Sequence, residues 1–247
     1  MDAHMAETRF HDMPGGRRIA FRHAAGAGPT LVFLPGYMSD MAGGKATALF
    51  AEAEAKGRAC LLLDYSGCGE SSGDFADGTL SRWRDEVLAL IEAYAEGEVL
   101  LAGSSMGGWL MLLVAERLGA RLAGMIGIAA APDFTRWGYD AAQRAALAAG
   151  ETVFEDNPYG PEPTPTYPGF FADAEANLRL DGTIAIDCPV RLVHGQGDAD
   201  VPWQTSLRLA EALRSDGIQV VLVKDGDHRL SRDGDIAIIK AQVARFY

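Results

Sequence analysis

Short apolar segments alternate along the chain with longer segments in which apolar residues recur at helical spacing. The short segments are bounded by glycine, proline or charged residues, a pattern that predicts buried strands. The predicted strands are RIAFRH (18–23), TLVFLPG (30–36), RACLLLDYSG (58–67), EVLLAGS (98–104), LAGMIGIAAAP (122–132), PVRLVHG (189–195) and IQVVLVKDG (218–226). Helices are expected at about 41–56, at about 80–94, from Ser105 onward and after each of the last two strands. Strands that are apolar on both faces and alternate with helices indicate an α/β fold, with a mostly parallel central sheet flanked by helices.

One segment interrupts this alternation. Residues 133–187 separate two predicted strands and contain five prolines between Pro158 and Pro168. A connection of this length is unusual in a compact domain, and such insertions commonly form lids or binding loops. We therefore expect a single domain over residues 1–247, with a cap inserted between late strands at about 133–187.

The composition narrows the classes of partner. The chain has 247 residues, and 48% of them are apolar, as in globular proteins. Its 34 acidic and 22 basic residues give a net charge of −12. Because an acidic surface repels phosphate backbones and anionic lipids, we expect neither a nucleic-acid partner nor membrane insertion. A small molecule is the expected partner. The sequence does not reveal the oligomeric state.

The cysteines and the absence of targeting signals bear on the compartment. Cys60, Cys68 and Cys188 are odd in number and unrelated in spacing, which argues against a disulfide framework or a zinc site. The chain does not open with the charged and apolar regions of a secretory signal, and no apolar stretch reaches membrane-spanning length. These features predict a cytoplasmic protein.

The strongest candidate for chemistry is the segment GSSMG at residues 103–107, which matches G-x-S-x-G between a predicted strand and a predicted helix. Glycine permits a sharp turn, so the central hydroxyl projects at the carboxyl edge of the sheet. The N-terminus of the new helix directs its free N–H groups to the same place. By position Ser105 is the candidate nucleophile, whereas Ser104 faces into the turn. A glycine-rich chain can also produce this pattern by chance, but the flanking strand and helix favour a catalytic serine.

A serine hydroxyl needs a base, and in this topology the base follows the last strand. Only two histidines follow Ser105, namely His194 and His228. His228 lies after the last predicted strand and is the candidate base. His194 ends a strand, where a packed or hydrogen-bonded role is expected.

An acidic residue should orient the base from a position after the penultimate strand. Asp198 lies just beyond the end of that strand and is our first choice. Asp133, directly after an earlier strand, is the second. Asp200 is the third, because capping the next helix, whose start is marked by Val201-Pro202, is an alternative role for it.

The oxyanion of an acyl-transfer intermediate needs N–H donors. The backbone N–H of Met106, directly after the candidate nucleophile, is one candidate. The N–H of Tyr37 is the other, because Gly36 permits close approach of the backbone; an ordinary Pro-Gly turn is the alternative. The Tyr37 ring, Phe134 and Trp137 are the candidate substrate-binding side chains.

Five segments, FLPGYMSD, LLLDYSGCGESSG, GSSMGGWL, CPVRLVHGQGDADVPW and GDHRL, resemble the α/β-hydrolase family over nearly the whole chain. GSSMGGWLML together with CPVRLVHG is most similar to the branch of palmitoyl-protein thioesterases, also described as acyl-glucuronide esterases. The resemblance implies Ser105 as nucleophile, Asp198 as acid and His228 as base, with activated esters or thioesters as substrates, no cofactor and no metal. Pro35 departs from the histidine that commonly precedes the oxyanion glycine of the family. An Arg- and Ser-rich transit sequence is not apparent, which favours a cytosolic relative of bacterial type.

These features predict a serine hydrolase that cleaves small-molecule carboxylic esters or thioesters through an acyl-enzyme. A C–C bond hydrolase or a perhydrolase on the same triad is the alternative, and a non-catalytic small-molecule binder is a third possibility. Residues 132–188 hold ten acidic and three basic residues. This local charge disfavours polyanionic leaving groups such as coenzyme A.

Overall fold

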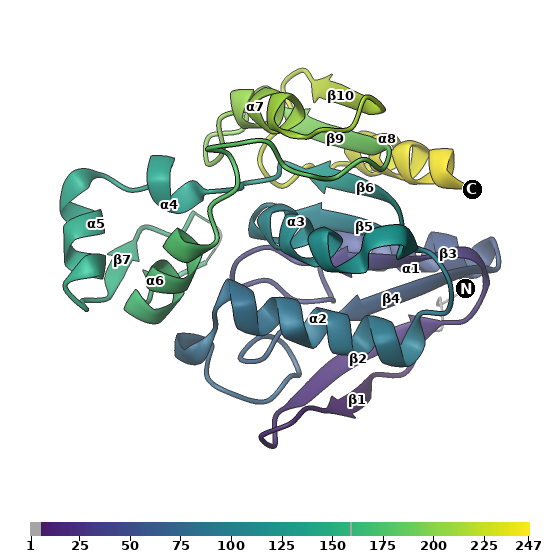
Figure 1. The fold of residues 1–247 in the computed structure, drawn as a ribbon, viewed down its shortest axis with the longest axis horizontal. Coiled ribbons are helices and arrows are strands. Elements are labelled where there is room, and N and C mark those ends of the chain that lie inside the picture. The colour runs from purple at the N-terminus through teal and green to yellow at the C-terminus, as the bar shows by residue number, and fades with distance from the viewer. Residues whose placement is uncertain (1–5, 159) are drawn as a thin grey trace.

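A central sheet of eight strands organises the computed structural model, which describes residues 6–158 and 160–247 (Figure 1). The strand order is β1-β2-β4-β3-β5-β6-β9-β10. β1 pairs antiparallel with β2, β2 pairs antiparallel with β4, and every later pair is parallel. The strands are β1 (Arg9–Asp12), β2 (Arg18–Ala24), β3 (Ala27–Leu34), β4 (Arg58–Leu63), β5 (Val99–Ser104), β6 (Leu122–Ile128), β9 (Val190–Gly195) and β10 (Ile218–Val223). The predicted α/β fold with a mostly parallel sheet is confirmed.

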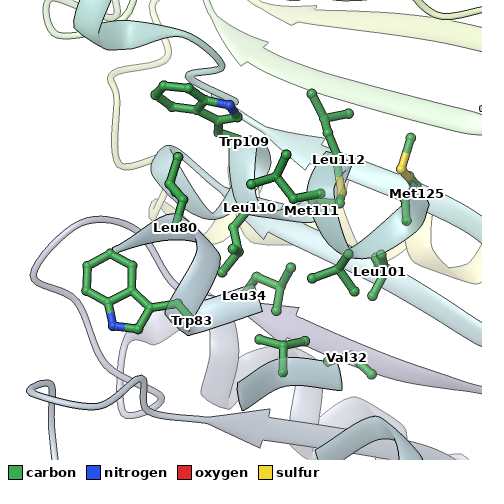
Figure 2. Packing of buried hydrophobic residues seen from close by; sticks show 14 of the residues in the cluster. Val32, Leu34, Leu80, Trp83, Leu101, Trp109, Leu110, Met111, Leu112 and Met125 are labelled. Carbon is green, nitrogen blue, oxygen red and sulfur yellow. The ribbon is translucent and has the colours of Figure 1, made fainter. Parts of the chain in front are cut away.

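Helices cover both faces of the sheet. Side chains alternate along β3, so Val32 and Leu34 join one apolar cluster while Leu31 and Phe33 join another. The first cluster lies under α2 (Leu80–Tyr94), α3 (Met106–Leu118) and α7 (Gln204–Ala212), and Figure 2 shows part of it. The second lies under α1 (Gly44–Ala55) and α8 (Asp233–Val243). Within the described ranges no helix has an apolar stretch long enough to cross a membrane.

Two local features differ from the sequence-based expectation. The edge strand β1 was not predicted, because its four residues are mostly exposed and carry no apolar pattern. Helix α1 begins at Gly44 instead of near Met41. The Met41 N–H donates to the carboxylate of Asp64 at 2.7 Å, and this long-range contact holds residue 41 in a loop.

Most of the insertion at 133–187 forms a lobe beyond the carboxyl ends of the parallel strands (Figure 1), and its last residues return to the main domain, where Ile184 and Ile186 join the first apolar cluster. The lobe contains α4 (Phe134–Trp137), α5 (Ala141–Ala148), the antiparallel pair β7 (Val153–Glu155) and β8 (Thr164–Thr166), and α6 (Pro168–Ala176). At its base the carboxylate of Asp133 accepts the N–H groups of Arg179 and Leu180. One buried carboxylate therefore joins the two ends of the insertion. The role of this lobe as a cap remains a prediction.

Candidate active site

Ser105 occupies a sharp turn between β5 and α3, with a backbone φ of 55°. Positive φ is costly for a non-glycine residue and persists only where the surroundings enforce it. Here the neighbouring glycines permit close backbone contacts. A Cβ on Gly107 would lie 2.1 Å from the carbonyl oxygen of Leu34, and a Cβ on Gly103 would lie 2.3 Å from the carbonyl oxygen of Gly107. The turn therefore requires glycine at both flanking positions of the motif.

The structure brings Ser105, His228 and Asp198 into one hydrogen-bonded line. His228 Nε2 lies 3.1 Å from Ser105 Oγ, and His228 Nδ1 lies 2.9 Å from Asp198 Oδ2. Because a carboxylate only accepts hydrogen bonds, Nδ1 carries the proton of the neutral ring. The lone pair of Nε2 then faces the serine hydroxyl. This arrangement can transfer a proton from Ser105 to His228.

Asp198 has a fully buried side chain. Its Oδ1 accepts the N–H groups of Asp200 and Val201, and its Oδ2 contacts both His194 and His228. Burial disfavours the charged carboxylate, but the hydrogen bonds from His194 and His228 outweigh it and hold the pKa of Asp198 well below its ordinary value. Asp198 is therefore ionised throughout the pH range in which histidine titrates.

The other two candidate acids lie elsewhere. Asp133 is buried at the base of the insertion, where it accepts two backbone N–H groups. Burial raises the pKa of Asp133, and those hydrogen bonds oppose the rise. Asp200 is exposed on the same turn as Asp198. Of the three, Asp198 contacts the candidate base, as the first choice from the sequence requires.

Ser105 and His228 line a cavity of about 640 Å³ between the sheet edge and the insertion. All four residues expected around the substrate, Tyr37, Met106, Phe134 and Trp137, line this cavity. The Tyr37 ring contacts Phe134 edge-on, and its hydroxyl donates to the carbonyl oxygen of Pro165 in β8. Tyr37 therefore links the loop after β3 to the insertion.

The candidate oxyanion donors lie at the Ser105 turn. Met106 is the first residue of α3, where a helix leaves its N–H groups without intrahelical partners. A Cβ on Gly36 would lie 3.3 Å from the Cβ of Ser105, so the loop that carries Tyr37 passes close to the serine. Both N–H groups belong to residues that line the cavity beside Ser105.

Sequence reasoning did not predict that His194 would contact Asp198. The segment HGQGD places the histidine at the end of β9 and the acid four residues later, but spacing alone does not reveal that the chain turns back between them. It also missed Tyr139 and Thr166, whose hydroxyl oxygens lie 2.7 Å apart at the edge of the cavity. Both residues belong to the proline-rich insertion, where the pattern of apolar residues predicted no elements.

Ligand atoms of Asp198, Asp200 and His228 lie within 4.8 Å of one another, so they are a candidate metal-binding group. Both nitrogens of His228 and both oxygens of Asp198 are already engaged in hydrogen bonds. A metal ion there would have to displace those contacts. The donor set therefore fits proton transfer better than metal coordination.

The family model described as "Alpha/beta hydrolase family" matches residues 31–243. The mitochondrial palmitoyl-protein thioesterase ABHD10 of mouse is 38% identical over 226 residues, which cover 90% of this chain and 76% of that protein. Its human counterpart is 34% identical over 239 residues, which cover 93% and 76%. A putative hydrolase from Agrobacterium vitis has a crystal structure with a TM-score of 0.90 and 38% identity, and the match covers 97% of this chain and 98% of that chain.

These relatives correct one expectation. The curated proteins from mouse and human are named as mitochondrial, which contradicts the prediction of a cytoplasmic protein. Cysteine usage was a poor guide, because a reducing compartment is not unique to the cytoplasm. The fold, the match over most of the chain and the similarity to named thioesterases agree with one another. The chain belongs to the alpha/beta hydrolase family and is a hydrolase.

Proposed function

We propose that the protein cleaves carboxylic esters or thioesters by nucleophilic catalysis, with Ser105 as nucleophile, His228 as base and Asp198 as the acid that orients the base. The observation that carries the proposal is the line of two hydrogen bonds from Ser105 Oγ through His228 to the buried carboxylate. The line ends at a cavity large enough for a small-molecule substrate.

The first step forms an acyl-enzyme. His228 Nε2 accepts the hydroxyl proton as Ser105 Oγ attacks the acyl carbon, and Asp198 stabilises the imidazolium that results. The N–H groups of Met106 and Tyr37 bind the oxyanion, and the N-terminus of α3 adds its dipole. The alcohol or thiol then leaves with the proton from His228.

Water completes the reaction by the same route. His228 accepts a proton from the water as it attacks the acyl carbon, and the collapse of the second oxyanion returns the proton to Ser105 Oγ. The carboxylic acid is released and the resting array is restored. Every proton transfer uses one nitrogen atom, His228 Nε2.

The substrate class follows from the site and from the relatives. The cavity wall near the insertion carries the rings of Phe134 and Trp137, which would contact the acyl group. The relatives from mouse and human are named palmitoyl-protein thioesterases, which supports including thioesters with oxygen esters. We place the substrate among small-molecule acyl esters and thioesters.

A substrate panel tests this function. Wild-type protein, Ser105→Ala and Ser104→Ala would be assayed with aryl esters, acyl thioesters and vinylogous diketones. We expect ester or thioester turnover in the wild type, its loss by a factor of about 10³ or more in Ser105→Ala, and much of it retained in Ser104→Ala. Equal losses in the two variants would overturn the assignment of Ser105. Turnover of diketones alone would move the reaction to C–C bond cleavage.

A further inference from the structure

A second histidine contacts the carboxylate that faces the candidate base. His194 is fully buried. Its Nε2 lies 3.1 Å from Asp198 Oδ2 and 3.1 Å from the carbonyl oxygen of Val201, and its Nδ1 lies 2.7 Å from the hydroxyl of Ser206 in α7. Every polar atom of this ring therefore has a partner.

These contacts fix the tautomer of His194. Both neighbours of Nε2 are acceptors only, so Nε2 must carry a proton. In the neutral ring Nδ1 then accepts the hydrogen bond of the Ser206 hydroxyl. His194 is thus a hydrogen-bond donor to Asp198 through Nε2.

The two oxygens of Asp198 have separate surroundings. Oδ1 is held by two backbone N–H groups, from Asp200 and Val201. Oδ2 lies between the two imidazole rings, 3.1 Å from His194 and 2.9 Å from His228. Loss of the His194 contact would leave the carboxylate anchored through Oδ1. His228 would then be the only side chain that donates a hydrogen bond to Oδ2.

We infer that His194 is a positioning residue that shares Oδ2 of Asp198 with His228 and thereby limits the basicity of the catalytic histidine. This inference rests on the proposed roles of Ser105, His228 and Asp198. A hydrogen bond that disperses the charge of a carboxylate weakens its attraction for a neighbouring imidazolium. With His194 in place, His228 more easily remains neutral, and it is the neutral form that accepts the proton of Ser105.

Uncharged residues face this array from the neighbouring strands and from α7. In the neighbouring strands β6 and β10 the register places Ile128 beside Val193 and Leu222 beside His194, and both are apolar. Helix α7 contributes the uncharged Ser206. Among the described residues, the titratable or charged groups near it are Asp198 and His228 themselves, the exposed Asp200, Asp227 and Arg229, and Lys45, which lines the same cavity as His228 and donates to the carbonyl oxygen of Arg229.

Two substitutions of His194 distinguish an effect on the basicity of His228 from a merely structural role. His194→Leu removes the donor to Oδ2, whereas His194→Gln keeps an N–H donor at a similar reach. The pH dependence of kcat/KM would be measured for both variants and the wild type with one aryl ester. In His194→Leu we expect the acid limb to move to higher pH by about half a unit or more, which lowers the rate on that limb about threefold while the alkaline plateau is largely kept. His194→Gln should keep the limb near its wild-type position.

The inference is overturned if the acid limb of folded His194→Leu stays within about 0.2 units of the wild type or moves to lower pH. It is also overturned if both variants lose activity to the same extent and their acid limbs coincide, because a residue with only a structural role would give that result. Circular dichroism and thermal unfolding would establish that each variant is folded.

A measurement on the wild type covers the case in which His194→Leu does not fold. Nitrogen-15 NMR of the histidine rings should show that the neutral His194 ring carries its proton on Nε2, from which it donates to Asp198. A neutral ring with its proton on Nδ1 would contradict the inference, because it could not donate to Oδ2. Labelling of wild-type Ser105 by a fluorophosphonate keeps the two hypotheses apart: if it fails, the proposed function is wrong, and if it succeeds, the His194 results stand on their own.

Discussion

His228 Nε2 lies 3.1 Å from Ser105 Oγ, although 123 positions separate the two residues in the chain. The sheet produces this contact, because β5, β6, β9 and β10 are consecutive neighbours and run parallel. The loops at their carboxyl ends therefore meet at one edge, where Asp198 joins the pair.

Asp198→Asn should reduce turnover by about 10³- to 10⁴-fold. The amide can present a donor to His228 Nδ1, which favours the tautomer with its proton on Nε2, and that tautomer cannot accept the proton of Ser105. Steady-state kcat with an aryl ester measures the effect. Asp200→Asn is the matched control and should remain within about tenfold of the wild type. Comparable losses in the two variants would show that the acid has been assigned wrongly.

Asp133→Ala should act on stability more than on chemistry. It leaves the N–H groups of Arg179 and Leu180 without their buried acceptor, which costs about 1–3 kcal/mol in the free energy of unfolding. Urea unfolding measures the loss, and limited proteolysis should show faster cleavage within residues 133–187. A loss of turnover as large as that of Asp198→Asn, in a folded protein, would support Asp133 as the acid after all.

The stability contributed by Asp198 should disappear in acid. Its folded-state pKa lies below the ordinary value of about 3.9 that it has when unfolded, so ionised Asp198 stabilises the fold above about pH 4. That stabilisation is lost as the pH falls below 4 towards the folded-state pKa. The difference in unfolding free energy between the wild type and Asp198→Asn should therefore shrink between pH 5 and pH 2. A difference that grows over this range would contradict the stabilising role of the carboxylate.

Gly107→Ala should destabilise the protein and reduce its activity. The new methyl group would meet the carbonyl oxygen of Leu34 at 2.1 Å, so the Ser105 turn would have to move away from β3. We expect a cost of about 1–3 kcal/mol, measured as a lower Tm. Gly169→Ala in α6 is the control, because its Cβ would meet nothing within 4 Å. If both variants melt at the wild-type temperature, the turn does not require glycine at position 107.

The parts of the site that depend on order along the chain could be predicted from the sequence. The pattern around Ser105 and the positions of Asp198 and His228 after late strands sufficed to name three residues that the structure brings together. Contacts that depend on the packing of distant side chains could not be predicted. The start of α1 depends on the capture of the Met41 N–H by Asp64, and the environment of Asp198 depends on the burial of His194.

The insertion was the least predictable part for a physical reason. Proline and glycine interrupt its pattern, and β7 and β8 have three residues each, too few for a periodicity to appear. The carboxylate of Asp133 joins its two ends, and the Trp109 N–H in α3 donates to the carbonyl oxygen of Asn177 at 3.0 Å. Neither contact has a local signal in the sequence.

The most direct test is to trap the acyl group on the enzyme. Wild-type protein would be mixed with an excess of an activated aryl ester, quenched in acid within the first turnover, digested and mapped by mass spectrometry. We predict an increase equal to the mass of the acyl group on the peptide that contains Ser105, at Ser105 itself, and no such adduct in Ser105→Ala. Turnover without any adduct on Ser105, or an adduct that persists on another residue in Ser105→Ala with activity unchanged, would contradict this prediction.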